Sequence, residues 1–250
     1  MRDITERKRA ENELLKALAR EKELGELKSN FVSMVSHEFR TPLGVIMSAS
    51  EILQRYLDRL PPEKRTHHLQ SIFTATQNLS RLVEEVLLLG KAEDGKMKFN
   101  PAPISLLTLC RLLADEVMSA TNRQCPIQVT ASSGVDGAQG DENLLRHIMT
   151  NLLTNAVKYS EPGKRVDVTV ERNHQYAVFH IRDQGIGIPP EDQPTVFDSF
   201  YRGRNVGHRP GTGLGLVIVK SCVKLHHGDI RLESKLGEGT TVIVRLPMFA

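Results

Sequence analysis

The chain has 250 residues, of which 40% are hydrophobic and 25% charged, a composition typical of a globular protein with one or two buried cores. Its formal net charge of +3 argues against a nucleic-acid-binding protein that works through a massed basic surface. The three cysteines lie far apart and in no CxxC spacing, so we expect free thiols in a reducing compartment. The sequence has no apolar run long enough to cross a bilayer and no signal segment at Met1, so we expect a cytoplasmic chain without direct membrane insertion.

The N-terminal segment, residues 1–28, is densely charged with both signs. Apolar residues recur at intervals of seven through this segment and just beyond its end, at Ala10, Ala17, Leu24 and Phe31. This period favours a coiled-coil linker, whereas a solvated amphipathic helix is the alternative because Gly25 and charged residues interrupt the seam.

Residues 29–95 carry two apolar patterns of helical spacing, separated by the turn-forming run DRLPPEK. In the first pattern His37 lies at the flank of the apolar face, and Pro42 is expected to bend the helix one turn later. The second pattern runs from Leu69 to Val86 at spacings of three and four. Because a helical hairpin alone has little core, we expect two copies to pair into a four-helix bundle and the chain to be a homodimer.

Residues 96–250 mix strand-like and helix-like segments, which predicts an α+β sandwich with an antiparallel or mixed sheet and helices on one face. The fold class expected for the whole chain is therefore multidomain, with an α-helical hairpin before an α/β sandwich. The expected strands are PIQVTA, RVDVTVER, QYAVFHIRDQG, GDIRLES and TTVIVRLP, and the expected helices are DENLLRHIMTNLLTNAVKYS and GLGLVIVKSCVKLHH.

The run NLLTNAVKYS places polar groups on one face of the first of these helices, at Asn151, Asn155, Lys158 and Tyr159. Amide oxygens and an ammonium group suit a magnesium ion and the oxygens of a polyphosphate. Alone, such a face is equally well explained as a solvated helix surface.

Two glycine-rich runs follow. In IRDQGIGIPP, Asp183 ends a strand and precedes Gly185 and Gly187, where the backbone can approach a flat ligand and the carboxylate can accept from an amine such as that of adenine. A simple turn is the alternative. In PGTGLGL, alternating glycines lead into a helix, whose first amides bind anions. The polar segment between them, residues 192–210, has the composition of a lid or of a disordered surface loop.

These motifs, in this order and spacing, resemble those of sensor histidine kinases over nearly the whole chain. SHEFRTPL resembles the phospho-acceptor motif of that family, and NLLTNAVKYS, DQGIGI, FDSFYRG and GTGLGL resemble the nucleotide-binding motifs of its catalytic domain. The N-terminal RDITERKRAENEL also resembles the segment that leaves a PAS sensor domain. The resemblance implies a coiled-coil linker over residues 1–28, a dimerisation and phosphotransfer hairpin over 29–95 and an ATP-binding domain over 96–250.

The resemblance also implies residue roles, with ATP and Mg²⁺ as cofactors. His37 is phosphorylated, Glu38 is its hydrogen-bonding partner and base, and Thr41 completes the HExxT pattern associated with dephosphorylation of the partner regulator. Asn155 is the magnesium ligand, with Asn151 on the same face; Asp183 recognises adenine; and phosphates contact Lys158, Tyr159 and Arg202. The other implied nucleotide-binding positions are Gly185, Gly187, Phe200, Gly211, Thr212, Gly213, Leu214 and Gly215.

The implied partners are the receiver domain of a response regulator, a second copy of this chain and an upstream sensor that the sequence does not contain. Three alternatives stay open: a dimeric scaffold without catalysis, a gyrase- or chaperone-type ATPase, and a regulator phosphatase that binds nucleotide. The HEFRTP run argues against the ATPase, and the intact nucleotide motifs argue against the scaffold.

Overall fold

The computed structural model describes residues 2–93, 95–198, 203, 205 and 212–249, and the chain divides into two compact units, residues 1–82 and 83–250. The first unit contains α1 (Arg2–Tyr56), the 3₁₀ turn η1 (Leu57–Arg59) and the larger part of α2 (Pro62–Glu93). The predicted helical hairpin is confirmed. Helix α1 continues through Pro42. The side chains at the four heptad positions lie outside the described part, so the coiled coil stays a prediction.

The turn of the hairpin follows from its two prolines. Pro62 begins α2, where its fixed φ fits the first helical turn and its missing N–H leaves no hydrogen bond unmade. Arg65 closes the turn because its Nε donates to the Leu60 carbonyl at 2.9 Å. Among the described hairpin residues up to position 82, only Ala49, Ala75 and Leu82 are buried apolar residues.

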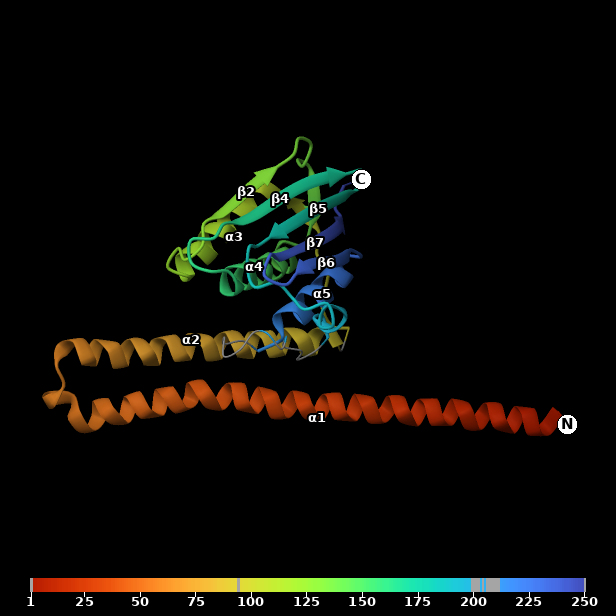
Figure 1. Ribbon diagram of the computed structural model, residues 1–250, viewed down its shortest axis with the longest axis horizontal. Helices are drawn as coiled ribbons and strands as arrows, with labels where there is room; N and C mark the ends of the chain where they lie inside the picture. Colours follow the sequence, from red (N-terminus) through yellow and green to blue (C-terminus); the bar gives the residue numbers. More distant parts are fainter. Residues whose placement is uncertain (1, 94, 199–202, 204, 206–211, 250) are drawn as a thin grey trace. The chain divides into compact units, whose positions relative to one another are not determined.

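The second unit contains a five-stranded sheet in the order β2-β4-β5-β7-β6. Its strands are β2 (Ile127–Ala131), β4 (Val166–Asn173), β5 (Tyr176–Arg182), β6 (Asp229–Lys235) and β7 (Gly239–Pro247). Strands β2 and β4 are parallel and the other pairs antiparallel, so the sheet is mixed, as predicted. Figure 1 shows α3 (Leu106–Ala120), α4 (Glu142–Tyr159) and α5 (Gly215–Leu225) on one face of this sheet.

Alternating burial along the strands and three-four spacing along the helices build the core between these layers. Val166, Val168 and Val170 of β4 are fully buried because side chains at every second position point to the same face. Helix α4 buries Leu152, Leu153 and their neighbours on its apolar face. Asp141 caps the start of α4: its Oδ1 accepts from the amides of Asn143 and Leu144 at 3.0 and 3.2 Å.

Some elements of the second unit are absent from the predicted set. Helix α3 is one, and a small antiparallel pair of strands, β1 (Ala102–Ile104) with β3 (Ala138–Gly140), is another. The last residues of α2, from Val83 to Glu93, belong to the second compact unit, although they continue a helix of the hairpin. Among the helices of the described residues, none has the length and apolar character needed to span a membrane.

Candidate functional site

His37 projects from α1 with an exposed ring: 74% of its side-chain surface is accessible. Its Nδ1 lies 3.7 Å from Oε1 of the half-buried Glu38, which is an electrostatic contact longer than a hydrogen bond. Thr41, one turn on, donates through its Oγ1 to the His37 carbonyl at 3.3 Å. The Glu38 carboxylate therefore faces the ring nitrogen Nδ1 of His37, and the other ring nitrogen, Nε2, is the one that can act as a nucleophile.

The second group of candidate residues lies on α4, where Asn151, Asn155, Lys158 and Tyr159 are each half-buried on the face opposite the core. The Asn151 amide is oriented because its Nδ2 donates to the His147 carbonyl at 2.9 Å. Its Oδ1 then faces the start of α5, where a Cβ added to Gly215 would lie 2.7 Å from that oxygen. The structure thus brings the polar face of α4 and the last glycine of GTGLGL into contact.

Asp183 follows β5 and organises the first glycine-rich turn. Its Oδ1 accepts hydrogen bonds from the amides of Gly185 at 2.8 Å and of Thr240 at 3.1 Å. Burial raises the pKa of Asp183 above its ordinary value, and the two backbone hydrogen bonds lower it in part. Because both described bonds go to Oδ1, the second oxygen, Oδ2, is the one that can accept from a ligand.

The same turn is tied to the end of α4. The Tyr159 carbonyl accepts from the amide of Ile186 at 3.2 Å, and Ser160 and Gly185 form an isolated antiparallel bridge. The Asp183 turn and the polar face of α4 are therefore neighbours. Lys158 extends over the Tyr159 ring, with its Nζ 4.7 Å from the ring centroid.

The two glycines of this turn are required by the packing. A Cβ at Gly185 would lie 2.5 Å from the Tyr159 carbonyl oxygen, closer than side chains approach backbone. Gly187 has φ +66°, a left-handed conformation, and a Cβ there would overlap the Lys235 carbonyl. These positions keep the backbone bare beside Asp183, as close approach of a flat ligand requires.

The GTGLGL motif is held by a side chain that we did not predict. Thr212 Oγ1 accepts from the amide of Leu214 at 3.2 Å and donates to Oε2 of Glu85 at 3.1 Å. Glu85 lies in the last part of α2 and is buried. It carries no motif, and 127 positions separate it from Thr212. Leu214 is buried, Gly213 adopts φ +70°, and Phe200, Arg202 and Gly211 lie outside the described residues.

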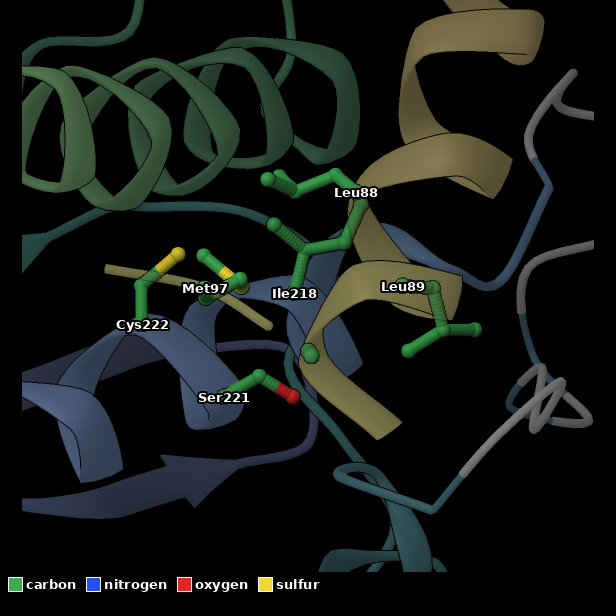
Figure 2. A pocket seen from close by; sticks show the side chains of 7 residues that line it. Leu88, Leu89, Met97, Ile218, Ser221 and Cys222 are labelled. Carbon is green, nitrogen blue, oxygen red and sulfur yellow. The ribbon is translucent and has the colours of Figure 1, made fainter. Parts of the chain in front are cut away.

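Apolar side chains of the end of α2 and of α5 line a common crevice, which Figure 2 shows: Leu88 and Leu89 come from α2, and Ile218 and Cys222 from α5. This shallow crevice has no space for a water molecule and no charged lining, so it does not fit a nucleotide.

The polar groups around Asp183 and α4 fit an adenine nucleotide with magnesium better than a metal ion alone. Among the described residues, no three His, Cys, Asp or Glu side chains gather as a metal site. The face instead offers amide oxygens, an ammonium group and a half-buried carboxylate with one oxygen left to accept. Mg²⁺ usually keeps several waters and is bound through few protein ligands together with substrate phosphates. Asn155 has the amide oxygen for such a ligand.

Two family models match separate parts of the chain. Residues 27–95 match the His Kinase A (phospho-acceptor) domain, and residues 140–250 match the histidine kinase-, DNA gyrase B- and HSP90-like ATPase family.

Two curated relatives match most of the chain. The circadian input-output histidine kinase CikA of Synechococcus elongatus is 33% identical over 240 residues, which cover 94% of this chain and 32% of that protein. Drug sensory protein A of Synechocystis is 37% identical over 235 residues, which cover 90% of this chain and 35% of that protein. The chain therefore spans about a third of the length of these relatives.

Two solved structures resemble the fold. The crystal structure of full-length ShkA in complex with AMPPNP matches with a TM-score of 0.65 and 27% identity, over 89% of this chain and 46% of that one. The mycobacterial sensor histidine kinase MprB matches with a TM-score of 0.53 and 31% identity, over 60% of this chain and 99% of that one.

Proposed function

Because the chain belongs to the sensor histidine kinases of two-component signalling, we propose that it phosphorylates its own His37 from ATP and passes the phosphoryl group to an aspartate of a response regulator. The observation that carries this proposal is the joint presence of an exposed histidine beside a carboxylate and a second unit whose polar groups suit a nucleotide.

In the proposed reaction the Nε2 lone pair of His37 attacks the γ-phosphorus, the bond to the bridging oxygen breaks, and ADP leaves. Glu38 lies on the side of Nδ1, where it stabilises the positive charge that develops on the ring and accepts the Nδ1 proton. The product is a phosphoramidate. Thr41 lies one helical turn from His37, which supports a further activity, the hydrolysis of the phosphorylated regulator.

For the nucleotide, we assign adenine recognition to Oδ2 of Asp183 and phosphate contacts to Lys158, Tyr159 and Arg202. Asn155 is the proposed Mg²⁺ ligand, with Asn151 beside it and the glycines of GTGLGL next to the phosphates. Magnesium, when bound, offsets negative charge on the phosphates as the γ-phosphoryl group leaves. The domains that we propose are a coiled-coil linker (1–28), a phosphotransfer hairpin (29–95) and an ATP-binding domain (96–250).

We propose a homodimer whose two hairpins form a four-helix bundle. The hairpin exposes large apolar side chains that need covering: Leu43 is 44% exposed, Val45 43%, Met47 71%, Leu69 59% and Phe73 56%. Pairing of two hairpins would bury such residues, as in a helical bundle.

The proposed partners are the receiver domain of a response regulator and an upstream sensor domain, of the PAS type, with no role for nucleic acid. We place the reaction in the cytoplasm; the three cysteines support this because they are free and buried. The match to the phospho-acceptor domain over residues 27–95 favours a kinase over a gyrase- or chaperone-type ATPase, in which a histidine hairpin is not expected.

The test is incubation of the purified chain with γ-³²P-ATP and magnesium, beside the His37→Gln variant. His67→Gln is a matched control, since His67 is an exposed histidine on α2. We expect acid-labile, alkali-stable label on the parent and on His67→Gln, and none on His37→Gln. Equal labelling of His37→Gln would exclude His37, and bound nucleotide without any transfer would favour the phosphatase or the scaffold.

A further inference from the structure

Glu85 is a buried acidic residue near the end of α2 that hydrogen-bonds to the GTGLGL motif. It is 8% exposed, and its Oε2 accepts from the Thr212 hydroxyl at 3.1 Å. Burial of a carboxylate costs free energy, which hydrogen bonds or opposite charges must offset. Because an apolar side chain of similar volume often serves stability equally well at a buried position, the carboxylate of Glu85 calls for a role beyond stability.

The packing of α2 holds Glu85 in this place. Leu88 and Leu89 follow it by three and four positions, so the three side chains lie on the same side of the helix. Both leucines line a crevice together with Ile218 of α5, as Figure 2 shows, and Leu89 is 4% exposed. The side of α2 that carries Glu85 is therefore the side that faces α5.

The Thr212 hydroxyl joins Glu85 to the residues that precede α5. A hydroxyl has one proton and two lone pairs, so donation of the proton to Glu85 leaves a lone pair for the amide of Leu214, at 3.2 Å. Helix α5 begins at Gly215, and no side chain of the described residues caps it. The turn from Thr212 to Leu214, in which Gly213 adopts φ +70°, therefore sets how α5 starts.

We propose that Glu85 is a positioning residue for the phosphates of the nucleotide, because its carboxylate orients the Thr212 hydroxyl and thereby the turn before α5. This inference rests on the proposed binding of ATP, in which the glycines of GTGLGL lie next to the phosphates. Amides at the start of a helix bind anions, and a turn that is already ordered loses less conformational entropy when the ligand binds.

The two partners of this contact belong to different family matches. Glu85 lies within residues 27–95, which match the phospho-acceptor domain, and Thr212 lies within residues 140–250, which match the ATPase family. Both residues lie in the second compact unit of the chain. The phospho-acceptor segment thus supplies a group that orders the nucleotide-binding motif of the ATPase segment.

Two substitutions separate the hydrogen bond of Glu85 from its charge. The negative charge repels phosphates, so its removal alone changes nucleotide affinity. Glu85→Gln removes the charge and keeps an oxygen that accepts from Thr212, whereas Glu85→Met has a similar length and removes both. Because neither variant carries the charge, a difference between them reports the hydrogen bond.

The experiment measures binding of AMPPNP and of adenosine, which lacks phosphates, by competition with a fluorescent ATP analogue. We expect Glu85→Gln to bind AMPPNP about 10-fold more tightly than Glu85→Met, and the two variants to bind adenosine equally. Addition of Thr212→Val to both variants should abolish the difference, because the hydroxyl is then absent. The matched control is the same pair of substitutions at the exposed Glu84, for which we expect equal affinities.

Three results would overturn the inference while ATP binding stands: equal AMPPNP affinity of the two Glu85 variants, an equal difference for adenosine, or a difference that persists with Thr212→Val. If Glu85→Met fails to fold, Thr212→Val and Thr212→Ser in the parent chain decide instead. Only Thr212→Val should lose AMPPNP affinity, and equal binding by these two variants would overturn the inference. Absence of AMPPNP binding by the parent would refute the proposed function as well.

Discussion

Replacement of Asp183 separates its structural role from its role in nucleotide recognition, because its two carboxylate oxygens have different tasks. Oδ1 accepts from the amides of Gly185 and Thr240, and Oδ2 is proposed to accept from adenine. Asparagine can place its amide oxygen at the position of Oδ1 and keep both backbone hydrogen bonds. Its NH₂ group then replaces Oδ2 and presents a donor to the adenine amine, which is also a donor.

We expect Asp183→Asn to keep the free energy of unfolding within about 1 kcal/mol of the parent and to lose about 2 kcal/mol of nucleotide affinity, or about 30-fold, the value of a charge-assisted hydrogen bond. Asp183→Ala leaves two backbone N–H groups without an acceptor. At about 1 to 3 kcal/mol for each such group, and with both groups only partly shielded from water, we expect a loss of about 2 kcal/mol of stability in addition to the loss of affinity.

Urea unfolding gives the stabilities, and titration with a fluorescent ATP analogue gives the affinities. Thr130→Ala is a suitable control because it alters a side-chain hydrogen bond in the same sheet, to the Val168 carbonyl, away from Asp183. Unaltered nucleotide affinity in Asp183→Asn, or an equal loss of stability in both Asp183 variants, would refute this division of roles.

Four further predictions concern backbone strain, packing, pH and thiol reactivity. His227 adopts φ +56° just after α5, a position where glycine is preferred, so His227→Gly should raise the free energy of unfolding in urea by about 1 kcal/mol; an unchanged value would contradict the strain. Gly187→Ala should lower stability by more than about 1 kcal/mol and weaken ATP binding, since its Cβ overlaps the Lys235 carbonyl; normal binding would count against the close approach. Because the pKa of Asp183 is raised, the carboxylate takes up a proton at a higher pH than an ordinary aspartate does, and nucleotide affinity should fall at that higher pH as the solution is acidified. The contribution of Asp183 to the free energy of unfolding has the opposite sign: it is present below the ordinary pKa and is lost as pH rises through the raised one. Measurements of nucleotide affinity and of stability as functions of pH check the two signs. Burial raises the pKa of Cys110 and Cys222 to about 12, so iodoacetamide at pH 8 should label these thiols only after denaturation, and rapid labelling of the native chain would contradict their burial.

Local patterns in the sequence predict the elements around the candidate site because each of these elements has its own periodicity. Helix α4 was predictable from the apolar spacing that ends at Val157, and β4 and β5 were predictable from their alternation. Helix α3 was missed, although buried residues at three-four spacing from Leu106 to Val117 are a usable signal. The short strands β1 and β3 are stabilised by tertiary pairing, and three residues carry too little pattern to predict.

For the candidate site, too, the sequence indicates residues that belong to a local motif, but it does not indicate contacts that depend on tertiary packing. The motifs single out Asp183 and Asn151 as candidate site residues, because the chemistry of a site limits which residue types can occupy it, and the roles of both residues stay predictions. The contact of Glu85 with Thr212 was not predictable, since it depends on how the end of α2 packs.

The most direct test of the central claim is ³¹P NMR of the chain after reaction with ATP and magnesium, because it identifies both the modified residue type and the ring nitrogen. Since Glu38 faces Nδ1, the account predicts a phosphoramidate at Nε2 of a histidine in the parent and no such resonance in the His37→Gln variant. A resonance from Nδ1-phosphohistidine, or one that persists in His37→Gln, would contradict the account.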